Sequence, residues 1–197
     1  VHSLSQNVHR VHPGVVVVPA MGGNTSDRPW FQPNEIARGL SQALGAKPRF
    51  FHAPALISPA LGASLRSERE LRSTMDLWDR AKVAVVGVGE WPKPDAAYAA
   101  AGFPVDHAAL EDAVGDVAGW SFTVGGRLLP YPGSQHFVGV TPRQLRRIPH
   151  VIGLAGGVAK ARAAIGAARA GLISVLVTDG ATARAISSAL DAEEGER

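Results

Sequence analysis

The sequence predicts an α/β domain built on a mostly parallel sheet with helices on both faces. Short apolar runs rich in valine and isoleucine alternate with helical segments, and glycine-containing turns follow several of the runs. The clearest run is residues 83–88, which leads into Gly89 and Glu90. Strands that alternate with helices form parallel sheets covered on both faces. No internal repeat or long linker divides the chain, so we expect a single domain over residues 1–197 with its core at about 14–190.

The elements of the first half follow from local patterns and end signals. Residues 15–18 are consecutive valines that we expect to form a buried parallel strand, and residues 49–53 are expected to form a second strand. A proline at the start and a glycine after the end predict a helix over residues 33–44. Apolar residues at helical spacing predict a longer amphipathic helix over residues 66–79. The third strand is residues 83–88.

The second half begins with a stretch rich in proline and glycine, residues 91–106, which we expect to be a loop. The glycine pair at 125–126 predicts a hairpin turn, and Thr141 followed by Pro142 predicts the start of a helix. The expected elements are a short helix at 107–114, β-structure at 117–124 and 127–129, a strand at 136–140, a helix at 143–147, a strand at 151–155, a helix at 158–169, a strand at 173–177, and a last helix from residue 178 with a frayed tail at 191–197.

Composition excludes several classes of protein. Apolar residues make up 46% of the chain and charged residues 19%, as in an ordered globular domain. The lack of cysteine excludes disulfides, zinc fingers and thiol chemistry. No apolar run approaches the roughly 20 residues that cross a membrane, and the first residues lack the apolar stretch of a signal peptide, so we expect a cytoplasmic protein with no membrane partner. The net charge is +3, but the basic residues are scattered, which favours solvated helix faces over a DNA-binding stripe.

The strongest candidate for ligand chemistry is the turn Ala155-Gly156-Gly157, with Lys160 three residues further on. Glycines allow the backbone to approach an anion, N–H groups at a helix start point toward it, and Lys160 adds a full positive charge. A tight turn with a solvent-facing lysine explains the same residues equally well, so spacing alone leaves both interpretations open.

A second candidate is Gly22-Gly23-Asn24-Thr25, directly after the first predicted strand. Its glycines and short polar side chains suit an oxygen-rich ligand, although a simple turn is slightly favoured for the loop in isolation. The dinucleotide pattern G-x-G-x-x-G and the phosphate-binding pattern G-x-x-x-x-G-K-[ST] are both absent. NAD and ATP are therefore weak candidates, and we predict no cofactor.

Two aspartates and the histidines complete the inventory of candidate groups. Asp116 stands at a strand edge, where its carboxylate suits sugar hydroxyls, although an exposed turn aspartate is the more ordinary explanation. Asp179 follows Thr178 at a helix start and is best explained as a cap. The seven histidines show no metal-ligand spacing, and no G-x-S-x-G elbow is present. We therefore predict no catalytic residue and no metal ligand.

Several segments in order resemble one protein family. The block VIGLAGGVAKARAAIGAARAGLISVLVTDGATARAI, residues 151–186, closely resembles the end of the sugar-binding domain of SorC-type transcriptional regulators, which include the central glycolytic gene regulator and the Bacillus-type deoxyribonucleoside regulator. Similar pieces occur at residues 21–25, 51–55, 81–89, 113–122 and 138–149, so the resemblance covers roughly residues 14–190. The final block is specific to the family, whereas single glycine pairs are not.

The resemblance implies a Rossmann-like fold related to sugar-phosphate isomerases and glucosamine-phosphate deaminases. It also implies a phosphorylated sugar bound by loops at the strand ends. By position, phosphate contacts come from the two glycine loops and Lys160, a sugar contact comes from Asp116, and further lining comes from the loop at 53–55 and the end of the third strand. The ligand-binding residues implied are Gly22, Gly23, Asn24, Thr25, Ala53, Pro54, Ala55, Gly89, Glu90, Asp116, Gly156, Gly157 and Lys160.

The function implied is that of an effector-binding domain that senses a sugar phosphate without transforming it. Regulators of this family carry an N-terminal helix-turn-helix, for which this chain leaves no room before its first predicted strand, so DNA would be bound only through a domain outside it. We expect a homo-oligomer, a dimer or tetramer, whose arrangement shifts on ligand binding. An isomerase or deaminase of sugar phosphates on the same fold is the main alternative, and a pure oligomerisation module with an empty pocket is the other.

Overall fold

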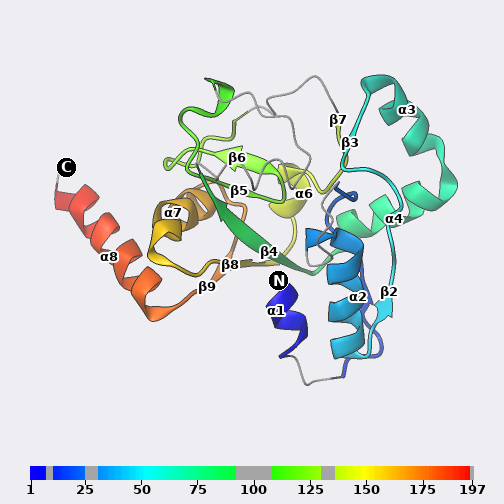
Figure 1. Ribbon diagram of the computed structural model, residues 1–197, viewed down its shortest axis with the longest axis horizontal. Helices are drawn as coiled ribbons and strands as arrows, with labels where there is room; N and C mark the ends of the chain where they lie inside the picture. Colours follow the sequence, from blue (N-terminus) through cyan, green and yellow to red (C-terminus); the bar gives the residue numbers. More distant parts are fainter. Residues whose placement is uncertain (8–10, 25–30, 92–107, 130–135, 196–197) are drawn as a thin grey trace. The chain divides into compact units, whose positions relative to one another are not determined.

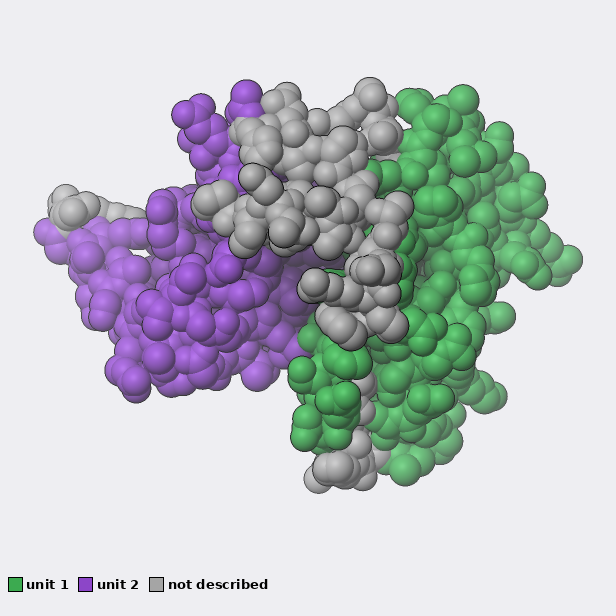
Figure 2. All heavy atoms as spheres, in the orientation of Figure 1, with its two compact units in different colours: residues 1–81, 94–105, 133–141 green, residues 82–93, 106–132, 142–197 purple. Residues whose placement is uncertain are grey.

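The computed structural model describes residues 1–7, 11–24, 31–91, 108–129 and 136–195 (Figure 1). The chain divides into two compact units, each made of three stretches of the sequence (Figure 2). Unit 1 comprises residues 1–81, 94–105 and 133–141, and unit 2 comprises residues 82–93, 106–132 and 142–197. Thr25 and nearly all of the predicted loop at 91–106 lie outside the described residues.

Unit 1 combines helices with two short two-stranded sheets. Strand β1 pairs in parallel with β2, and β3 pairs antiparallel with β7. The described elements are α1 (His2–Ser5), β1 (Val16–Val17), α2 (Pro33–Leu44), β2 (Lys47–Pro48), β3 (Leu56–Ile57), α3 (Pro59–Ser67), α4 (Arg69–Arg80) and β7 (His136–Phe137). Trp78 of α4 is buried, where its indole N–H donates to the carbonyl of Pro19 at 2.9 Å and its ring meets the edge of Phe51.

Helix α2 confirms its predicted bounds. Pro33 occupies the first turn and Gly45 ends the helix in the left-handed conformation at φ 59°, as the end signals predicted. The strand expected at 49–53 is wrong, because only Lys47 and Pro48 pair with β1. Instead, the backbone N–H and carbonyl of Phe51 bond the side-chain amide of Asn34 at 2.9 and 3.1 Å.

Two further expectations for unit 1 need correction. The helix expected at 66–79 is two helices, because Glu68 has extended backbone angles between α3 and α4. The strand expected at 15–18 is shorter, because β1 comprises Val16 and Val17 alone, and it is parallel as expected but not buried, since Val16 is 46% exposed and Val17 half-buried.

Unit 2 is built on a five-stranded sheet in the order β6-β5-β4-β8-β9. Strands β4, β8 and β9 are parallel, whereas β5 and β6 run antiparallel to their neighbours. The described elements are β4 (Val83–Glu90), η2 (Ala108–Leu110), β5 (Gly115–Val117), β6 (Trp120–Phe122), α6 (Pro142–Leu145), β8 (His150–Leu154), η3 (Val158–Lys160), α7 (Ala161–Arg169), β9 (Val175–Val177) and α8 (Gly180–Gly195). The predicted α/β class is confirmed, with a mixed sheet at its centre.

Helix α7 packs closely on the sheet of unit 2 through small residues (Figure 1). A Cβ built on Gly115 of β5 would lie 2.3 Å from the carbonyl oxygen of Gly89 and 2.7 Å from the Cβ of Ala163 in α7. Glycine is therefore required at this contact between strands and helix. None of the described helices combines the length and apolar character needed to span a bilayer.

Local details of unit 2 differ from expectation in two places and agree with it in a third. The helix expected at 107–114 is reduced, over its described part, to the single turn η2. Strands β5 and β6 form a hairpin around Ala118 and Gly119, which both have positive φ as the tightest hairpin turns require. The turn at Gly125-Gly126 was expected and is present, closed by the N–H of Gly126 on the carbonyl of Thr123.

The tail expected to fray from residue 191 remains helical to Gly195. Glu193 of α8 pairs with Arg169 at the end of α7, with 2.5 Å between Nη2 and Oε2. This ion pair between helices stabilises the last turns that the sequence predicted to be loose.

Candidate functional site

The candidate site of unit 2 lies where β4 changes its partner. Residues Val83 to Gly87 of β4 pair with β8, whereas Val88 to Glu90 pair with β5. Strand β8 ends at Leu154, and its chain continues into the glycine loop. Ligands of α/β sheets collect at such points, outside the carboxyl ends of parallel strands. Four of the predicted residues, Gly89, Glu90, Gly156 and Gly157, stand on the segments that leave this edge.

Lys160 reaches this edge of the sheet. Its Nζ donates to the carbonyl oxygen of Val88 at 2.8 Å, and the side chain is half-buried. Val88 lies one residue beyond the last pair between β4 and β8, so the ammonium group bonds a strand carbonyl just past the end of parallel pairing. An ammonium group has three N–H donors, and one bond to a carbonyl leaves capacity for an anion.

The glycine loop before Lys160 presents backbone donors. Gly156 and Gly157 are exposed, and Gly157 has φ 101°, a conformation that L-residues with a side chain rarely adopt. Its N–H donates to the carboxylate of Asp179 at 2.8 Å. Within the described part of the chain, the N–H groups of Gly156, Val158 and Ala159 have no acceptor. Such exposed donors at the start of a helical segment suit an anion.

Val158 and Ala159 were missed by the sequence interpretation, because their side chains carry no polar group. Their contribution is the backbone alone, and the only sequence signal for it is their position between a glycine pair and a helix. Gly157, in contrast, was predicted as a phosphate contact, and the structure gives its N–H to Asp179.

Asp179 is the N-cap of α8, as predicted, and it also joins two loops. Its Oδ1 accepts the N–H of Thr182 at 2.8 Å, and its Oδ2 accepts the Thr182 hydroxyl at 2.7 Å and the N–H of Gly157. Hydrogen bonds from the backbone and hydroxyl of Thr182, and then from Gly157, lower the pKa of Asp179 well below its usual range. The group therefore remains ionised at neutral pH.

The two predicted carboxylates of the site stand on adjacent positions of the sheet but not on the same face. Asp116 is in register with Gly89, and Glu90 is in register with Gly115. Directly opposed residues of an antiparallel pair share a face, and successive residues alternate, so Asp116 and Glu90 are on opposite faces. They do not form a carboxylate pair for acid–base chemistry.

The remaining predicted residues lie together in unit 1. Gly23 donates to the carbonyl of Ala53 at 2.9 Å and accepts from the N–H of Ala55 at 2.7 Å, which places the two predicted loops side by side. A Cβ on Gly22 would lie 2.6 Å from the backbone of Ala53 and Pro54, so this close approach needs glycine. The side chains of Ala53 and Ala55 are buried, whereas Pro54 is exposed.

Asn24 uses its side chain to close its own loop. Its Nδ2 donates to the carbonyl of Phe31 at 2.9 Å, and its own carbonyl accepts the side-chain amide of Gln32 at 3.0 Å. The Asn24 side chain thus holds its own loop together, and Pro54 is an exposed residue of the neighbouring loop.

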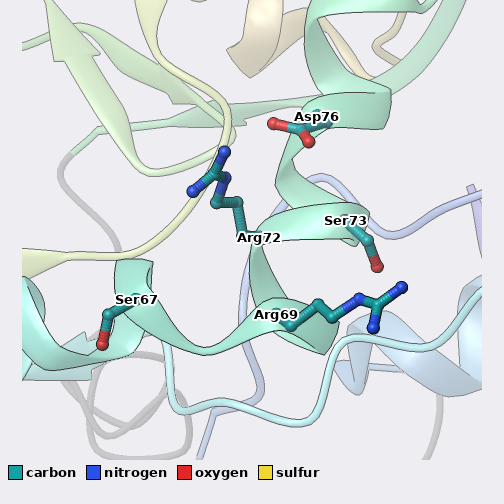
Figure 3. A pocket seen from close by; sticks show the side chains of 5 residues that line it. All are labelled: Ser67, Arg69, Arg72, Ser73 and Asp76. Carbon is teal, nitrogen blue, oxygen red and sulfur yellow. The ribbon is translucent and has the colours of Figure 1, made fainter.

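A separate hollow of about 370 Å³ lies at the junction of α3 and α4 in unit 1 (Figure 3). None of the predicted site residues lines it, and its lining is polar: Ser67, Arg69, Arg72, Ser73 and Asp76. The guanidinium groups of Arg69 and Arg72 point in different directions rather than toward a common centre (Figure 3). Across the described ranges, no group of three or more His, Asp or Glu residues is arranged to hold a metal ion.

Comparison with known proteins shows the family of the chain. Residues 1–187 match the Sugar-bind family model, which describes a sugar-binding domain. The chain is 33% identical over 141 residues to the transcriptional regulator LsrR of Enterobacter sp. (strain 638), a match that covers 68% of this chain and 44% of that protein. It is 25% identical over 174 residues to the sorbitol operon regulator of Klebsiella pneumoniae, covering 86% of this chain and 55% of the regulator. The chain thus spans about half the length of these relatives.

Solved structures show the same fold. The full-length sorbitol operon regulator SorC of Klebsiella pneumoniae superposes with a TM-score of 0.85 at 25% identity, over 93% of this chain and 62% of that one. A domain of a sugar-binding transcriptional regulator from Arthrobacter aurescens TC1 gives a TM-score of 0.78 at 27% identity, over 94% of this chain and 73% of that one. The chain therefore belongs to the Sugar-bind family, the sugar-binding domain of SorC-type transcriptional regulators.

Proposed function

We propose that this chain is the effector-binding part of a bacterial transcriptional regulator and that its effector is a phosphorylated sugar. The observation that carries the proposal is the edge of unit 2, where the ammonium group of Lys160 accompanies exposed N–H donors at Gly156, Val158 and Ala159. Backbone donors at a helix start together with a lysine suit a phosphate group. The relatives are regulators, one of them named for a sorbitol operon, which supports a carbohydrate ligand.

The sugar part of the ligand is assigned to polar groups near that edge. Asp116, half-buried on β5 beside Gly89, offers a carboxylate that suits sugar hydroxyls. The loops of unit 1 at residues 22–25 and 53–55 stay predictions from the family resemblance.

A sensor is favoured over an enzyme on the same fold. Asp116 and Glu90 stand on opposite faces of the sheet, so they do not form the acid and base that an isomerase or deaminase would use on one substrate. The curated relatives are transcriptional regulators rather than enzymes of sugar phosphates. We therefore propose that the ligand leaves unchanged.

In this proposal the ligand acts by shifting a conformational equilibrium. A ligand that bonds several loops favours the arrangement in which those loops are ordered, and it thereby changes contacts between copies of the domain. We propose a single effector domain in a cytoplasmic homo-oligomer, a dimer or tetramer. DNA would be bound by a helix-turn-helix in another part of the regulator, whose spacing the oligomer sets.

The test is a thermal-shift screen of this chain with phosphorylated sugars, the parent sugars and inorganic phosphate. A sensor is stabilised by about 2.7 kcal/mol at a ligand concentration of 100 times Kd, and the ligand is recovered unchanged. Formation of product by chromatography would support the enzyme instead. No shift with any sugar phosphate would support a domain that only mediates oligomerisation.

A further inference from the structure

The carboxylate of Asp179 reaches beyond its own helix. An N-cap needs one oxygen to accept an N–H of the first turn, and Oδ1 does this with Thr182 at 2.8 Å. The second oxygen accepts the N–H of Gly157 at 2.8 Å, although Gly157 is 22 residues away in the sequence. This bond joins the turn after β9 to the glycine loop after β8, and helix capping does not require it.

The bond restrains a residue that would otherwise be mobile in its backbone. Gly157 is exposed, and a Cβ built on it would meet nothing within 4 Å, so surrounding atoms do not hold it in place. Glycine has access to more backbone angles than any other residue. Its two described tethers are the bond from its N–H to Asp179 and the bond from the N–H of Lys160 to its carbonyl at 2.9 Å.

The orientation of Gly157 determines how its neighbours present their donors. The N–H of Val158 belongs to the peptide group that directly follows Gly157, and the N–H of Gly156 belongs to the peptide group just before the one that bonds Asp179. The N–H of Ala159 follows that of Val158. A rotation at Gly157 would turn these groups away from one another. A loop held in its binding arrangement before the ligand arrives loses less entropy on binding.

We propose that Asp179 is a positioning residue for the anion loop, holding Gly157 so that the N–H groups of Gly156, Val158 and Ala159 serve one phosphate group. This inference rests on the proposed function, because it concerns the same loop. Asp179 is itself negatively charged, and a role limited to charge would weaken phosphate binding. Its removal should therefore strengthen binding if it acts by charge and weaken binding if it acts by position.

The test uses the variant Asp179→Ser with Thr182→Val as its control. A serine caps a helix as well as aspartate does but is too short to reach Gly157, so Asp179→Ser retains the cap and loses the tether. Thr182→Val removes the hydroxyl bond to Asp179 and leaves the tether. We expect affinity for the sugar phosphate found in the screen, and for inorganic phosphate, to fall about tenfold in Asp179→Ser and to stay near wild type in Thr182→Val. Unchanged or tighter binding in Asp179→Ser would overturn the proposal.

A second measurement does not depend on the ligand. The amide hydrogen of Gly157 should be protected from exchange in the ligand-free wild-type chain, and it should exchange about tenfold faster or more in Asp179→Ser while amides of β8 remain protected. Equal exchange in both proteins would overturn the positional role, whatever the binding result. If the wild-type chain binds no phosphate compound at all, the proposed function fails, and the exchange of Gly157 still shows whether the tether holds the loop.

Discussion

Replacing Lys160 with methionine tests the anion site most directly. The change keeps an unbranched aliphatic side chain in a half-buried position and removes the ammonium group that lies 2.8 Å from the carbonyl oxygen of Val88. Two effects should then separate. The ligand-free protein loses one hydrogen bond, and the liganded protein also loses a charge-assisted contact to phosphate.

The sizes of the two effects follow from the contacts. One hydrogen bond contributes about 1 kcal/mol, which for a chain of this size lowers the Tm of the ligand-free protein by about 2–4 °C. A charge-assisted contact to phosphate contributes about 2 kcal/mol, or roughly 30-fold in Kd. At the ligand concentration that stabilises the wild type by about 2.7 kcal/mol, the variant would be stabilised by about 0.9 kcal/mol. The ligand-induced shift should thus fall from about 5–11 °C to about 2–4 °C.

The assay is thermal unfolding with and without the sugar phosphate, and Lys82→Met is the matched control. Lys82 is exposed and directly precedes the opposite end of β4, so the control removes the same charge from the same unit at a distance from the site. The reasoning is refuted if Lys160→Met retains the full ligand-induced shift. It is also refuted if Lys82→Met loses as much, because the effect would then come from net charge.

Three other variants or conditions test the framework around the site. Gly115→Ala should lower the free energy of unfolding, measured in urea, by about 1–3 kcal/mol, because the new Cβ would lie 2.3 Å from the carbonyl oxygen of Gly89. If the variant is as stable as the wild type, the strands can move apart enough to accept the methyl group, and the argument for glycine here is wrong. Because the pKa of Asp179 is lowered in the folded chain, its carboxylate contributes fully to the free energy of unfolding above about pH 4, and this contribution is lost as the pH falls further. Urea titrations should therefore show a shallower loss of stability between about pH 4 and 2 in Asp179→Ser than in the wild type. Parallel curves for the two proteins would contradict the hydrogen bonds assigned to Asp179. Trp78→Phe should cost about 1–3 kcal/mol, because the buried carbonyl of Pro19 loses its donor, and an unchanged denaturation midpoint would contradict that bond.

Local patterns were sufficient where an element is determined by its own residues. Helix α2 has proline in its first turn and glycine after its last, and both signals act within a few residues. The valine run of β4 predicted a strand, which the structure extends to Glu90. The cap at Asp179 was also a local prediction, because the acceptor and the N–H of Thr182 are three residues apart.

Contacts between distant segments were not predictable in the same way. The strand expected at 49–53 failed because the backbone of Phe51 bonds the side chain of Asn34, 17 residues earlier. In the glycine loop, the family resemblance implied a phosphate contact at Gly157, and the structure gives its N–H to a carboxylate 22 residues later. In both places a side chain far along the sequence bonds a backbone group, and neither bond has a signature in the neighbouring residues.

The exchange of partners along β4 explains why the site has no compact motif. Parallel pairing of β4 with β8 ends at Gly87, while β4 continues for three more residues beside β5. The carbonyl of Val88 therefore lies beyond the pairing with β8, and Lys160 bonds it. The ammonium group is thus bonded at this edge by a neutral carbonyl oxygen, and among the described residues no ion pair to Lys160 is present. In our proposal, a phosphate group would meet a positive charge already positioned by the sheet, together with backbone donors whose orientation depends on Asp179. In the proposed site, selectivity for an anion would therefore depend on where strand pairing stops, which only the assembled sheet determines.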